Sequence, residues 1–163
     1  MSATAYTQLL QEFSVLLGVD SPEIDENSGL EFEHDDLLVK IYAFPDFSKV
    51  AVDVEIFKLD ENASAEINEQ RLKMLHQLNS LTRYTHGALA TITLDNMLVL
   101  GGSAEILEIN APGLVNMFNN MIQSGLDMRN MWSELWNLIE MAQDELNTYQ
   151  QPREGGMGSP IYA

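Results

Sequence analysis

The segment THGALATITLDNMLVLGG, residues 85–102, carries almost no charge, although it lies in a chain with a formal net charge of −17. Two apolar runs, 88–94 and 97–100, flank the short step Asp95-Asn96. Short apolar runs joined by turn-forming residues predict a β-hairpin. A hairpin this apolar needs other parts of the protein to cover it.

Three further strands are predicted upstream, at 30–34, 37–44 and 49–57, because apolar and polar residues alternate there with period two. In the third, Val50, Val52, Val54 and Ile56 share one face. Phe57 is then expected on the opposite face. Asp35-Asp36 and the segment 45–48 supply the turns.

Helical periodicity predicts an amphipathic helix over 4–18 that ends at Gly18, a second over about 65–81 and a long one from Asn110 to Tyr149. Gly125 is expected to dent or split the last one. The strip AEILEI, 104–109, could prolong the sheet. The order is helix, three strands, helix, two or three strands and a long helix. It predicts an α+β fold with a twisted antiparallel sheet and helices packed on one face.

The length of 163 residues fits a single domain, which we place at 1–149. The remainder, 150–163, is rich in Gly and Pro and is predicted to be a disordered tail. No apolar run approaches the ~20 residues of a membrane span. The N-terminus has no basic residue before Lys40, unlike a secretory signal peptide. We therefore expect a soluble, cytoplasmic protein without membrane insertion.

The chain has 25 acidic residues, 8 basic residues and no cysteine. This balance argues against nucleic acid and anionic membranes as partners, because both attract Lys and Arg. The absence of cysteine excludes disulfides, thiolate nucleophiles and zinc–thiolate sites.

Catalytic chemistry finds little support in the sequence. His34 next to Asp35 and Asp36 is the best metal or acid–base candidate, but no third ligand stands at a telling spacing. A calcium loop counted from Asp25 would need Gly at position six and Glu at position twelve, where Leu30 and Asp36 stand. We predict no catalytic residue, metal site or cofactor, and no enzyme. The alternative from this class is a small-molecule or metal-binding enzyme that uses His34 and the acidic loop.

Apolar surface is the more informative signal. If the valines of 50–54 face the helices, several large apolar residues lie on the other face of the sheet, where they could dock a partner chain, be covered by a loop or tail, or form ordinary surface. These residues are Leu38, Tyr42, Phe44 and Phe57. In the helix 65–81, Leu72 and Leu75 widen the apolar stripe that contains Leu78, which leaves room for a subunit contact.

Three segments resemble the class I type III secretion chaperones, the Tir chaperone-like family. LLQEFSVLLGVDSPEIDENSGLEFEHDDLLVKIYAF, 9–44, is similar to the family's opening helix, acidic loop and first strands. LHQLNSLTRYTHGALATITLDNMLVL, 75–100, resembles its Leu-rich helix and hairpin, and LVNMFNNMIQSGLDMRNMWSEL, 114–135, its closing helix.

The resemblance implies a homodimer in the bacterial cytoplasm that binds the N-terminal segment of a secreted effector in extended form. It further implies that the complex stays soluble and can be presented to the export ATPase, with no ATP hydrolysis by the chaperone. We expect the effector to contact an apolar face made of Phe13, Leu38, Tyr42, Phe44 and Phe57. We expect the hairpin 88–100 to lie in the centre of the sheet, covered by helices on one side and by the dimer partner on the other. Leu72, Leu75 and Leu78 are expected to help form the dimer interface. The alternative is a dimeric protein-interaction or regulatory module without a secretion client.

Overall fold

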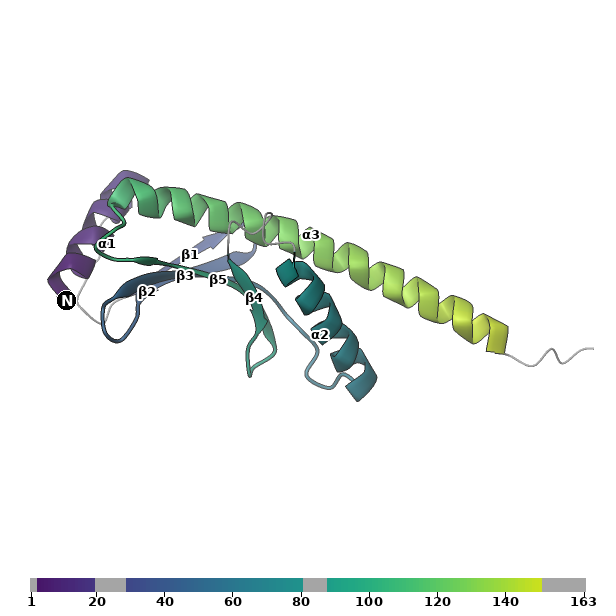
Figure 1. The fold of residues 1–163 in the computed structure, drawn as a ribbon. Helices are drawn as coiled ribbons and strands as arrows, with labels where there is room; N and C mark the ends of the chain where they lie inside the picture. The colour runs from purple at the N-terminus through teal and green to yellow at the C-terminus, as the bar shows by residue number, and fades with distance from the viewer. Residues whose placement is uncertain (1–2, 20–28, 81–87, 151–163) are drawn as a thin grey trace, which may run out of the picture.

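Five antiparallel strands form one sheet in the order β1-β2-β3-β5-β4 (Figure 1). The structure is a computed structural model and describes residues 3–19, 29–80 and 88–150. The elements are α1 Ala3–Leu17, β1 Leu30–His34, β2 Leu37–Ala43, β3 Lys49–Lys58, α2 Ala65–Ser80, β4 Leu89–Ile92, β5 Met97–Glu105 and α3 Ala111–Gln150. The predicted α+β class and element order are confirmed.

The turns form where they were predicted. Asp35 and Asp36, between β1 and β2, both have positive φ angles, of 48° and 62°. Positive φ at both central residues is the geometry of a two-residue hairpin turn that matches the twist of the strands. Asn96, in the β4–β5 hairpin, also has a positive φ of 61°. Asn and Asp tolerate this conformation better than most residues.

The expected place of the hairpin is wrong, because β4 lies at the edge of the sheet and only β5 is interior. The strip 104–109 prolongs the sheet only by Ala104 and Glu105, the last residues of β5, and adds no third strand. The Glu105 carbonyl accepts the amides of Glu108 and Ile109 in a turn, at 3.0 and 3.1 Å. Ile106, the first residue after β5, is buried.

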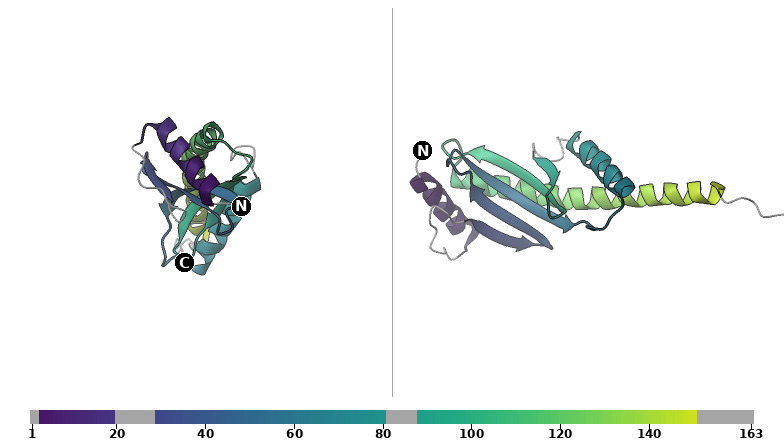
Figure 2. Two further views of the ribbon diagram at one scale, coloured as in Figure 1. Left: turned by 90° about the vertical axis from the view of Figure 1, so that its left-hand side faces the viewer. Right: turned by 90° about the horizontal axis from the view of Figure 1, so that it is seen from below.

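A single long helix covers one face of the sheet. Figures 1 and 2 show α3 running across the strands and continuing past them, with α1 beside its first half. Phe13 of α1 packs edge-to-face on Phe32 and Phe118, with ring centroids 6.0 and 5.6 Å apart. α2 lies beside the β4 edge instead of over the face (Figure 1). Among the described residues, no helix is long and apolar enough to cross a membrane.

Gly125 does not split α3, which is continuous through that position. A Cβ atom there would lie 2.8 Å from Cγ1 of Val54 and 3.4 Å from Cδ1 of Leu37. The glycine therefore allows the helix backbone to approach the sheet closely at this point. Most of the predicted tail 150–163 lies outside the described residues, so the domain boundary at 149 stays a prediction.

A β-bulge in β3 changes the face on which its last residues lie. Glu55 pairs with Val99, but Phe57, not Ile56, pairs with Leu98. The extra residue reverses the alternation. Phe57 thus turns to the α3 side and packs on Trp132, with ring centroids 6.0 Å apart. The prediction that Phe57 lies opposite the helices is wrong for this reason.

We expect Gly125→Val to lower the free energy of unfolding by about 1–3 kcal/mol, the usual cost of overpacking a core. The gain in helix propensity over glycine is a few tenths of a kcal/mol and does not offset it. Urea unfolding followed by circular dichroism measures the change, with Gln123→Val, at an exposed position of the same helix, as the control. A Gly125→Val protein as stable as the parent would contradict the close approach.

Candidate functional site

The face of the sheet opposite α3, here called the open sheet face, has no helix over it in the described part of the chain (Figure 2). Strand register places Leu38, Lys40 and Tyr42 of β2 there, opposite Glu55, Asp53 and Ala51 of β3. Apolar and charged side chains therefore alternate across this surface, as the sequence predicted.

Polar side chains on the open sheet face are paired with one another. Tyr42 Oη donates a hydrogen bond of 2.7 Å to Asp53 Oδ2, and Lys40 forms an ion pair with Glu55. Burial, together with the bond to Asp53, raises the pKa of Tyr42 to about 12, so its phenol remains a donor at neutral pH. The hydrogen bond to Glu55 raises the pKa of Lys40.

The predicted effector-binding residues do not all share one surface. Tyr42 and Phe44 are 40% and 38% exposed, and Leu38 is half-buried on the open sheet face. Phe57 lies on the other side because of the bulge. Phe13 is fully buried between the sheet and α3, so it is a core residue and not part of a surface.

The exposed apolar residues of α1 were missed by the sequence analysis. Val15 and Leu16 are 70% and 55% exposed, and they border a shallow apolar groove with Ala111 and Pro112 of α3. They lie off the stripe that packs into the core. Val15, outside the apolar stripe that helical periodicity predicts, was the available signal, whereas Leu16 falls in that predicted stripe and is exposed all the same.

β1 offers a free strand edge. It pairs only with β2 among the described strands, so the outer side of its backbone has no strand partner there. An exposed edge is a template for an added strand. This edge adjoins the open sheet face, where apolar side chains of β2 are exposed.

α2 presents Leu72 to solvent, at 61% exposure, and half-buried Leu75. Leu78, the third residue predicted for the dimer interface, is 1% exposed and already packs in the chain's own core. It is corrected to a core residue, because it lies on the helix face that includes buried Met74.

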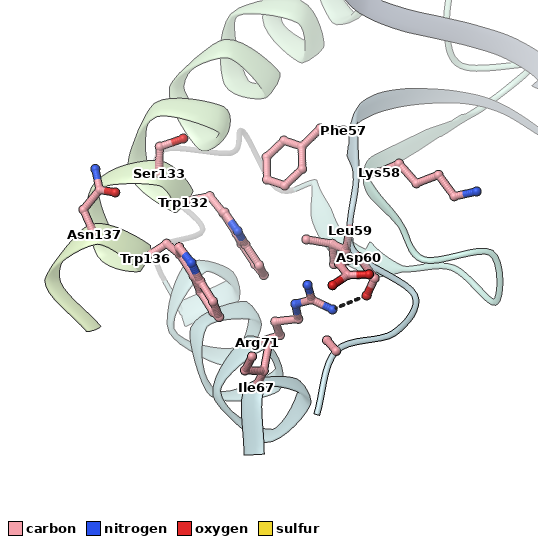
Figure 3. Close-up of a pocket in the computed structure, with 11 residues that line it drawn as sticks. Phe57, Lys58, Leu59, Asp60, Ile67, Arg71, Trp132, Ser133, Trp136 and Asn137 are labelled. Carbon is pink, nitrogen blue, oxygen red and sulfur yellow. Dashed lines mark hydrogen bonds between the residues drawn. The ribbon is translucent and has the colours of Figure 1, made fainter. Parts of the chain in front are cut away.

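A pocket of about 470 Å³ lies where the end of β3, the start of α2 and the second half of α3 meet (Figure 3). Its apolar walls come from Phe57, Trp132, Trp136 and Ile67, and Arg71 of α2 reaches into it. The sequence analysis did not identify it. Two tryptophans at i and i+4 on one helix were the only local sign.

His34 and Asp35 lie close together but form no metal centre. His34 Nε2 is 3.6 Å from Asp35 Oδ2, and both side chains are more than half exposed. Within the ranges that the structure describes, no group of three or more potential ligands converges.

Asn79 joins α2 to the sheet through the same pair of backbone groups that a neighbouring strand would bond. Its Nδ2 donates to the Ala90 carbonyl at 2.9 Å, and its Oδ1 accepts the Ala90 amide at 2.8 Å. This paired contact satisfies both backbone groups of a buried residue in an edge strand, where an unpaired group would be costly.

We expect Asn79→Ala to lower the free energy of unfolding by about 1–3 kcal/mol, because two hydrogen bonds to buried backbone are lost. Urea unfolding measures the change, and hydrogen exchange at the Ala90 amide should speed up. Ser80→Ala, which removes an exposed hydroxyl bonded to the Gln77 carbonyl, serves as the control. Unchanged exchange at Ala90 would contradict the docking role of Asn79.

The helix–sheet–helix arrangement is the fold of the type III secretion chaperones. The structure of the Yersinia pestis chaperone SycH in complex with a stable fragment of YscM2 matches with a TM-score of 0.55 and 15% identity, over 75% of this chain and 98% of that chain. The HopA1–SchA chaperone–effector complex matches with a TM-score of 0.63 and 12% identity, over 80% and 97%. The ExsC–ExsE complex matches with a TM-score of 0.60 and 15% identity, over 82% and 94%.

No protein-family model and no curated protein sequence matches this chain. The shared fold is therefore recognised from the structures alone. At such low identities, the residues that would bind a partner must be argued from this chain's own surface.

Proposed function

We propose that the protein is a cytoplasmic chaperone of a bacterial type III secretion system. It binds the N-terminal segment of a secreted effector in extended form, keeps it soluble and competent for secretion, and helps to target it to the export ATPase. The role requires no catalysis. The observation that carries the proposal is the match over almost the whole length of two solved chains, a type III secretion chaperone bound to a fragment of YscM2 and the HopA1–SchA chaperone–effector complex.

The open sheet face and the β1 edge suit an extended client. A segment that adds to the edge gains main-chain hydrogen bonds, while apolar side chains on alternate positions supply selectivity. Tyr42 and Phe44, both exposed at the end of β2, are the apolar contacts that we assign to the client, together with Leu38. The net charge of −17 keeps a protein with such exposed apolar surface dispersed.

The direct test is affinity purification from the native host, followed by mass spectrometry and limited proteolysis of the bound protein. The proposal requires a secreted protein held by a protease-protected segment near its N-terminus. A client held through a folded domain would instead support the dimeric interaction or regulatory module. Recovery of no protein other than the chain itself would contradict both.

We expect the double variant Tyr42→Ser/Phe44→Ser to bind that client about ten- to a hundredfold more weakly, because burying an aromatic side chain contributes about 1.5–3 kcal/mol. Isothermal titration with the client's N-terminal segment measures it. Leu107→Ser removes an exposed apolar side chain elsewhere and should leave the affinity unchanged. An equal loss of affinity in the double variant and in Leu107→Ser would show that the open sheet face is not the client-binding surface.

We propose that the protein is a homodimer whose contact includes Leu72 and Leu75 of α2 and the adjacent Leu89 of β4. Leu89 of β4 is 57% exposed beside this helix, so apolar residues of two elements are available together. Apolar side chains left exposed on adjacent elements are typical of subunit contacts.

We expect light scattering to give a mass of about twice 18.3 kDa for the parent and a shift toward 18.3 kDa for Leu72→Asp, because a charge buried in the contact lacks a partner. Leu94→Asp, in the exposed β4–β5 turn, should remain dimeric. A Leu72→Asp dimer of undiminished stability would place the contact elsewhere.

A further inference from the structure

Arg71 is a buried cation without a counter-ion in the part of the chain that the structure describes. It is 8% exposed, and no carboxylate of the described residues lies within ion-pair distance of it. The lysines of these residues behave differently, because each pairs with a glutamate. The pairs are Lys40–Glu55, Lys49–Glu105, Lys58–Glu61 and Lys73–Glu69.

Neutral groups hold Arg71 in place. Its Nη1 donates to the Asp60 carbonyl at 2.9 Å and to Asn68 Oδ1 at 3.1 Å. Within the described residues, Nε and Nη2 of the same guanidinium donate to no group. A guanidinium carries five N–H donors, and a buried charge is costly unless an opposite charge or further hydrogen bonds compensate it.

The free side of this guanidinium faces the pocket. Figure 3 shows Arg71 between the two tryptophans of α3 and the connection that leads from β3 to α2. The carboxylate of Asp60, also in the lining, accepts the Asn62 amide at 2.9 Å. Lys58, at the rim, is paired with Glu61. Arg71 is thus the lining cation that is open to an anion.

The rest of the lining is largely apolar and therefore favours an aromatic or large apolar group. The apolar lining includes Phe57, Trp132 and Ile67, and a volume of about 470 Å³ accommodates one such side chain with part of its backbone. A carboxylate next to that side chain would complete the hydrogen bonding of Arg71, and charge-assisted bonds of this kind are the strong ones.

We propose that this pocket binds an aromatic side chain flanked by a carboxylate in the client polypeptide, with Arg71 as the recognition residue. The inference rests on the proposed function only in taking a client polypeptide as the occupant. The net negative charge of the chain does not prevent this, because at physiological salt charges beyond a Debye length of about 8 Å are largely screened.

The two tryptophans of the chain, Trp132 and Trp136, both line the pocket, so intrinsic tryptophan fluorescence of the whole protein reports on it alone. The probe is the peptide acetyl-Leu-Phe-Glu-amide, which contains no tryptophan. We expect a saturable change in emission on titration. The matched peptide acetyl-Leu-Phe-Gln-amide should bind about tenfold more weakly, because it lacks the charge.

Two variants test the residue. Arg71→Gln should abolish the difference between the two peptides. Asn137→Glu, at an exposed lining position, adds a negative charge to the pocket wall and should weaken binding of the Glu peptide severalfold while leaving the Gln peptide unchanged. Arg129→Gln, which alters an arginine bonded to the Asp35 carbonyl outside the pocket, is the control and should bind like the parent.

Equal affinity for the Glu and Gln peptides, or no effect of Asn137→Glu, would overturn the proposal. So would emission that changes with protein concentration but not with peptide, because the occupant would then be a second copy of the chain. Failure here leaves capture of a client on the open sheet face intact. If the Glu peptide binds as expected but affinity purification recovers no secreted client, the result contradicts the chaperone role and leaves the pocket proposal intact.

Discussion

The close approach of α3 to the sheet at Gly125 is the contact on which the architecture depends. One 40-residue helix covers the face formed by the central strands, with Val54 directly beneath the glycine. Such a helix is about 60 Å long, whereas a strand of ten residues spans only about 33 Å. The second half of α3 must therefore extend past the sheet, as Figure 1 shows. There it meets α2, and the pocket between them follows from this difference in length.

Period-two and helical patterns were sufficient to predict the elements, because each half-buried strand or helix must place its apolar residues on one side. The pattern could not reveal the bulge in β3, since residues 50–57 alternate without interruption. One extra residue moved Phe57 from the open sheet face to the α3 side. The hairpin at 89–105 was misplaced for a different reason: its apolar composition reflects contacts with α2 and α3, and not a central position in the sheet.

The candidate site was predictable only where it depends on the alternation of side chains between the two faces of a strand. Tyr42 and Leu38 could be assigned to the open sheet face because their positions alternate with buried Val39 and Ile41. Phe13 and Leu78 were assigned to surfaces although each belongs to the apolar stripe of its helix, and the stripe is what packs inward. The pocket joins residues from three elements, between Phe57 and Asn137, and no local pattern predicts such a junction.

The charged residues that the structure describes fall into two kinds, those exposed to water and the buried Arg71. The exposed lysine–glutamate pairs contribute little stability in water, and the 8 basic residues of the chain leave a large excess of negative charge from its 25 acidic residues. Such an excess of surface charge is typical of proteins that must stay dispersed. Arg71 is different, because it is removed from water and held by two neutral acceptors. Solubility cannot account for a buried cation, whereas recognition of an anionic group on a partner can.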